Sequence, residues 1–144
     1  MKTRRLHSNK IQISPGVYLH LSLLLLVLPL QYIASFLISG IIHEIGHLLA
    51  LRTLKVPICR LRITVLGTVI ETYEITPMQE MVCAAAGPLA GILTCMAART
   101  FPLLGICAFI QTAYNLIPLY PFDGGRICKC CMAILSEKKN SLQR

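Results

Sequence analysis

The segment SGIIHEIGHLLAL, residues 39–51, places two histidines and a glutamate inside an apolar run. On a helix, His43 and His47 are four residues apart, so both imidazoles project from one face and can bind the same metal ion. Glu44 follows the first histidine, where it can accept a proton from water rather than bind the metal. Because ionisable side chains are costly in such a run, they indicate function.

The pattern HExxH is typical of zinc hydrolases, whose single zinc ion takes three protein ligands and one water. The third ligand that we predict is Asp123, the only aspartate of the chain, in the segment NLIPLYPFDGGR. Taken alone, its Asp-Gly pair is equally typical of a turn or a helix N-cap. The other interpretation of the two histidines is that hydrogen bonds to a neighbouring helix satisfy them. The glutamates lie near a predicted hairpin or the tail: Glu71, Glu74, Glu80 and Glu137.

Four apolar runs would have to position these side chains: 17–30, 32–51, 78–98 and 101–119. With 55% hydrophobic and 14% charged residues, the composition is that of a membrane protein. The second run is long enough to cross a hydrocarbon core of about 30 Å as a helix. We expect a mainly α, polytopic membrane helix bundle of about four transmembrane helices. A cleaved signal peptide ending near 33–35 is the competing interpretation of the first run.

The net charge of +8 is spread over alternate connections between the apolar runs. Basic residues precede the first run, follow the second and follow the fourth, as expected when both termini are cytoplasmic. A nucleic-acid-binding patch would not alternate in this way, so we expect no nucleic-acid partner. The chain is then one membrane-embedded domain, 1–144, with a basic cytoplasmic head at 1–13 and a polar tail at 136–144. We expect a multi-pass protein of a bacterial cytoplasmic membrane.

Residues 59–75 differ from the apolar runs because apolar and polar side chains alternate there. Gly67 permits a turn in the middle of this segment. The pattern predicts a β-hairpin on the cytoplasmic side, between helices two and three. An edge of this hairpin could hold an extended substrate by strand addition.

Pro118 and Pro121 interrupt the chain after the fourth run, because each removes an N–H donor. Broken backbone at membrane depth is tolerated where it lines a cavity. We therefore expect 115–124 to bend and carry Asp123 toward the histidines. Asn115 could bind substrate backbone or brace a neighbouring helix, and its spacing does not decide between these roles.

The seven cysteines are an odd number and show no disulfide framework. The group CKCC at 128–131 could bind metal, but it lacks a spaced second pair. We favour reduced thiols at a membrane surface for this group.

The pair of motifs HEIGH and NLIPLYPFDGG resembles the site-2 protease family of intramembrane zinc metalloproteases. The resemblance covers roughly residues 20–128 and is closest to the compact branch of stage IV sporulation protein FB. It implies that His43, His47 and Asp123 bind zinc and that Glu44 is the general base. It also implies that Asn115 acts near the substrate. The segment AAAGPLAG resembles the family's Ala-Gly-Pro motif, but Gly91 stands where many members have asparagine.

The resemblance implies hydrolysis of a peptide bond in or near a transmembrane segment of a membrane protein or a membrane-tethered regulator precursor. The partners would be that substrate, the lipid bilayer and a membrane regulatory protein. Two other classes are compatible with the same residues: a catalytically inactive membrane scaffold and a zinc-handling membrane protein. No PDZ or CBS regulatory domain fits within the 144 residues of this sequence.

Overall fold

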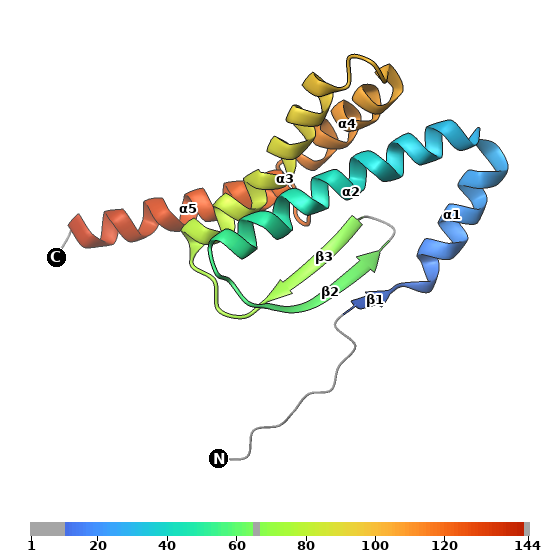
Figure 1. The fold of residues 1–144 in the computed structure, drawn as a ribbon. Coiled ribbons are helices and arrows are strands. Elements are labelled where there is room, and N and C mark those ends of the chain that lie inside the picture. Colours follow the sequence, from blue (N-terminus) through green and yellow to red (C-terminus); the bar gives the residue numbers. More distant parts are fainter. Residues whose placement is uncertain (1–10, 65–66, 143–144) are drawn as a thin grey trace.

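Helices dominate residues 11–64 and 67–142, the part of the chain that the computed structural model describes (Figure 1). Residues 1–10 of the predicted basic head and residues 143–144 of the predicted tail lie outside it. The elements follow one another as β1 (Ile11–Ile13), α1 (Pro15–Val27), α2 (Leu30–Thr53), β2 (Ile58–Thr64), β3 (Gly67–Thr72), α3 (Pro77–Ala97), α4 (Pro102–Asn115) and α5 (Asp123–Leu142).

The first four helices coincide with the four apolar runs, but their lengths differ. α2, with 24 residues, and α3, with 21, are long and apolar enough to cross a membrane. α1 has 13 residues and α4 has 14. Pro29 separates α1 from α2. Because proline has no backbone N–H to donate, it does not continue α1, and it takes the N-cap position of α2. Two membrane-spanning helices are therefore supported, and the count of about four stays a prediction.

α3 is the central helix, since it contacts α2, α4 and α5. Its start is fixed by a reciprocal capping box in which Thr76 and Gln79 satisfy each other's backbone N–H groups. Small residues along its length let the neighbouring helices approach closely. At Gly91 the side chain of Thr112 on α4 occupies the space that a Cβ would need. The residue that departs from the family motif thus serves the packing of α3 on α4.

The predicted hairpin is confirmed: β2 and β3 pair antiparallel, with Thr64 opposite Gly67. The sheet nevertheless has a third strand, because β1 pairs in parallel with β2 and aligns Ile11 with Leu61. The last three residues of the predicted basic head therefore form a strand that the sequence did not predict. A three-residue strand has too short an alternation to be recognised, and its partner lies far along the chain.

A small apolar cluster attaches the sheet to the helices. Ala50 and Leu51 near the end of α2 pack with Val56 and with Cys83 on α3, and the partly buried Ile70 of β3 packs against this cluster. The sheet therefore lies alongside the second half of α2, as Figure 1 shows. This is the half of the helix that carries the two histidines.

Candidate metal centre

The imidazoles of His43 and His47 face the interior of the helix bundle, with 4% and 6% of each residue exposed. Their Nε2 atoms lie 3.2 Å apart. The Nδ1 atom of His47 lies 2.8 Å from the backbone carbonyl oxygen of Cys83 on α3. Since a carbonyl oxygen can only accept, Nδ1 carries the proton and Nε2 of His47 presents a lone pair.

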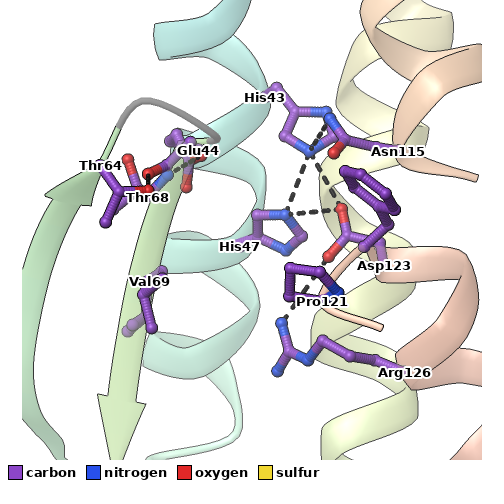
Figure 2. A pocket seen from close by; sticks show the side chains of 13 residues that line it. His43, Glu44, His47, Thr64, Thr68, Val69, Asn115, Pro121, Asp123 and Arg126 are labelled. Carbon is purple, nitrogen blue, oxygen red and sulfur yellow. Dashed lines mark hydrogen bonds and ion pairs between the residues drawn. The ribbon is translucent and has the colours of Figure 1, made fainter. Parts of the chain in front are cut away.

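Asp123 comes from a different part of the chain and lies against the same two rings (Figure 2). Its Oδ2 atom is 3.1 Å from Nε2 of His43 and 3.2 Å from Nε2 of His47. The segment 116–122 between α4 and α5 is not helical, and Asp123 is the first residue of α5. Gly124 permits this sharp return, because a Cβ there would collide with the carbonyl of Leu116. The predicted bend is present.

The geometry of these three side chains fits a zinc ion. Ligand atoms about 2.0–2.1 Å from a tetrahedral zinc lie roughly 3.3 Å from one another. The three observed separations, 3.1, 3.2 and 3.2 Å, are close to that value. Within the described residues, His43, His47 and Asp123 are the one group of three potential ligands close enough to share an ion.

Gly87 on α3 is a second indication of a metal site, because it leaves space next to the two imidazoles. A Cβ at this position would collide with Nε2 of His47 and would lie 2.7 Å from Nε2 of His43. The glycine therefore keeps open the side of the ring nitrogens on which a cation would have to lie.

Glu44 lies beside this group, on the side of α2 that faces the sheet (Figure 2). Its Oε1 atom accepts a hydrogen bond of 3.3 Å from the backbone N–H of Thr68 on β3. Its Oε2 atom is buried and has no hydrogen-bond partner among the residues that the structure describes. One carboxylate oxygen is thus held by the sheet, and the other is available to accept a proton.

A cavity of about 190 Å³ joins these side chains to the sheet. Asn115, at the end of α4, lines the cavity, and its Nδ2 atom lies 3.4 Å from Nε2 of His43. The other walls are residues of β3, the proline-rich segment and the first turn of α5. The full lining is His43, Glu44, His47, Thr64, Gly67, Thr68, Val69, Ile70, Asn115, Pro121, Phe122, Asp123 and Arg126.

Two of the other acidic residues that the sequence offered are occupied elsewhere. Glu71 pairs with Arg60 and Arg62 on the neighbouring strand. Glu80 lies 3.5 Å from Arg126. Among the described residues, the carboxylate close enough to share an ion with both histidines is that of Asp123.

Within the described residues, the cysteines of the CKCC group do not form a group of three potential ligands close enough to share an ion. Cys128 and Cys131 are exposed, and Cys130 is buried against α3. Burial and the nearby carboxylate of Glu80 raise the pKa of the Cys130 thiol, so that it stays protonated at neutral pH. That these cysteines are reduced thiols at a membrane surface stays a prediction.

Sequence reasoning missed the contribution of Gly87, Thr68 and Arg126 to the site. Gly87 is visible in the sequence as the glycine of AAAGPLAG, but its contact with the histidines depends on how α3 packs on α2. The backbone N–H of Thr68 carries no signal in its residue type. Arg126 lies three residues after Asp123, but in the sequence it indicates only the positive charge expected on the cytoplasmic side of a membrane.

No protein-family model matches the chain. Over 120 residues the chain is 31% identical to a protein of Methanocaldococcus jannaschii named zinc metalloprotease MJ0392. The match covers 74% of this chain and 34% of that relative, so the chain spans about a third of the relative's length. A solved structure, the site-2 protease from Methanocaldococcus jannaschii, superposes with a TM-score of 0.69 at 26% identity. That match covers 89% of this chain and 68% of the other.

Proposed function

The chain belongs to the site-2 protease family, and from this premise we propose that it is an intramembrane zinc metalloprotease. It hydrolyses a peptide bond in or near a transmembrane segment of a membrane protein or membrane-tethered regulator precursor. The observation that carries the proposal is the convergence of three buried potential ligand atoms next to a glutamate whose Oε2 has no hydrogen-bond partner among the described residues. Three lone pairs that face one another need a cation or a proton between them.

The proposed metal ligands are Nε2 of His43, Nε2 of His47 and Oδ2 of Asp123. A zinc ion held there would supply Lewis-acid activation of a water molecule and of the scissile carbonyl. Glu44 acts as the general base: its Oε2 takes the proton of the attacking water and later delivers it to the leaving amine nitrogen. The water oxygen first adds to the carbonyl carbon, and the C–N bond breaks when the amine nitrogen receives the proton from Glu44. The backbone N–H of Thr68 keeps the other oxygen of Glu44 in place during both transfers.

Asn115 is the proposed substrate contact. Its amide lies at the wall of the cavity next to the metal ligands, where it can hydrogen-bond the backbone of an unwound substrate. An α-helical substrate hides its carbonyls in hydrogen bonds between residues four apart, so it must open locally before it is cut.

The free edge of β3 suits such an extended segment. In the described sheet β3 is an edge strand, and Thr68, Val69 and Ile70 line the cavity. The N–H of Thr68 points away from β2 toward Glu44, and successive residues of a strand alternate between its two edges. The next outward donor is therefore the backbone N–H of Ile70. A carbonyl oxygen of a substrate strand would accept a hydrogen bond from it.

Ile70→Pro should lower kcat/KM at least tenfold while zinc content stays within twofold, because proline removes this outward donor together with the Ile70 side chain. Cleavage and bound zinc are measured on the same reconstituted sample. Ile70→Ala, which keeps the backbone N–H, is the control for loss of the packed side chain. Unchanged cleavage by the proline variant would contradict strand addition.

The proposal also covers the location of the protein in the membrane, its partners and its branch of the family. The two long apolar helices and the family suit an integral membrane protein. We propose a multi-pass arrangement with both termini cytoplasmic, a lipid bilayer around the bundle, a regulatory membrane partner and kinship to the compact sporulation-protein branch.

Glu44→Gln tests the function most directly. The chain is reconstituted in lipid vesicles with a transmembrane peptide whose centre is weakened by glycine, and zinc is measured by elemental analysis. The proposal expects wild type to bind one zinc and cut the peptide, and the variant to bind zinc and cut at least about a hundredfold more slowly. His43→Ala should lose the metal and the activity together. A Glu44→Gln variant that cuts as fast as wild type would exclude Glu44 as the general base, and a wild type that binds zinc but does not cut would favour a zinc carrier or scaffold.

A further inference from the structure

The two carboxylate oxygens of Asp123 face different partners. Oδ2 lies between the two imidazoles, and Oδ1 lies 3.7 Å from Nη1 of Arg126, one turn later on α5. Figure 2 shows the guanidinium of Arg126 below the carboxylate, on the side away from His43. The proposed ligand is therefore held from behind by a positive charge.

Arg126 is itself held by the neighbouring helix. Its Nε donates to Oε1 of Glu80 on α3, 3.5 Å away. Glu80 lies in the first turn of α3, directly after the capping box of Thr76 and Gln79 that fixes where this helix begins. A chain of contacts thus runs from the start of α3 through Glu80 and Arg126 to Asp123.

We propose that Arg126 is a positioning residue that orients Asp123 as a one-oxygen ligand, and that Glu80 fixes the guanidinium for this task. A carboxylate that rotates freely can offer a metal either oxygen or both. A planar guanidinium beside Oδ1 restricts that rotation and leaves Oδ2 for the ion. Outer partners of this kind orient metal ligands and change metal affinity when removed. The inference rests on the proposed function, because it assumes that Asp123 binds zinc.

A different role for Arg126 is open to test, because it lines the cavity and its side chain is 31% exposed. In that position it could instead contact the substrate. A substrate contact would change KM and leave zinc binding in the absence of substrate unaltered. Metal affinity of the substrate-free protein therefore separates the two roles.

The experiment measures zinc affinity of the full chain in lipid nanodiscs by competition with a chromophoric chelator. Arg126→Gln should weaken zinc binding by about 10- to 100-fold. Arg126→Lys keeps the charge and should recover part of the loss. Glu80→Gln should weaken binding less than Arg126→Gln, and should add little to it in the double variant because both act through one contact. Lys129→Gln, the next basic residue on α5, is the matched control and should bind like wild type.

The visible absorption spectrum of the Co²⁺-substituted protein is the second measurement. Arg126→Gln should alter the bands that report coordination by Asp123, whereas Lys129→Gln should not. Wild-type zinc affinity and an unaltered spectrum in Arg126→Gln would overturn the inference and leave the proposed function intact. Additive effects of the Glu80 and Arg126 variants would overturn the part assigned to Glu80. A wild-type chain that binds no zinc would refute the proposed function itself.

Discussion

The two faces of α2 carry opposite kinds of side chain. The inward face carries Ser39, His43 and His47 at intervals of four residues, all buried. The outward face carries Ile38, Ile41, Ile45 and Leu49, all exposed. A soluble protein buries its large apolar side chains and exposes its polar ones.

On α2 this distribution is reversed, which indicates that the outward face contacts lipid and the inward face contacts protein. Apolar side chains that cover the outside of a 24-residue helix match a lipid phase. Polar side chains buried inside it need partners, and they find them across helices: Ser39 bonds Gln111 of α4, and His47 bonds the carbonyl of Cys83 of α3. The inward face is thus where chemistry is possible, and the outward face is where only burial in lipid is needed. Substitutions on each face should therefore fail in different ways.

The largest effect is expected where a side chain would fill the space before the inward face. Gly87→Ala places a methyl group against Nε2 of His47. We expect zinc affinity to fall by at least about 100-fold, the upper end of what loss of an outer partner causes. The chelator competition assay in nanodiscs measures this change.

Gly91→Ala is the matched control, because it lies one turn along the same helix and gains the same helix propensity of about 1 kcal/mol. Its methyl group would meet Thr112 rather than a histidine. The expected result is destabilisation of about 1–3 kcal/mol from overpacking, with zinc affinity changed only a few-fold. Equal losses of zinc in both variants would mean that Gly87 acts through helix packing alone.

The sequence alone predicted those site residues whose positions depend on local spacing. The histidines and Glu44 could be recognised because they lie on one helix, where spacing fixes direction. Asp123 could be recognised because the chain has no other aspartate and the prolines indicate a bend before it. Their roles in binding and catalysis stay predictions, although the structure brings the four side chains together.

Other features could not be predicted because they depend on how distant segments pack. The contact of Gly87 with the histidines requires the depth at which α3 meets α2. The N–H of Thr68 reaches Glu44 only because the apolar cluster around Leu51 holds the sheet against α2. The parallel pairing of Ile11–Ile13 with β2 joins segments about 50 residues apart. None of these contacts has a local pattern.

A charge on the outward face should produce the next largest effect. Ile41 lies near the middle of α2 and is 59% exposed. Ile41→Lys should disfavour membrane insertion by about 2.5–3.5 kcal/mol, because its ammonium group lies far from either membrane surface. The fraction of chain that resists extraction at alkaline pH measures insertion. Leu49→Lys, near the helix end, should insert better because its side chain can reach the headgroups. Equal insertion of both variants and wild type would contradict a lipid-facing outward surface.

The smallest effect is expected at Ser39. This inward residue holds two helices together and is not part of the proposed metal site. Its hydroxyl donates to Oε1 of Gln111 at 2.7 Å, one turn before His43. Hydrogen bonds between membrane helices contribute about 0.6 kcal/mol on average, so Ser39→Ala should lower the free energy of unfolding by roughly that amount. Unfolding in mixed micelles provides the measurement, with Ser22→Ala as control, because that hydroxyl bonds only within α1. The cleavage rate at saturating substrate should stay within about twofold of wild type, since Ser39 contacts none of the proposed ligands. A large loss of rate at unchanged stability would instead place Ser39 among the residues that position the metal site.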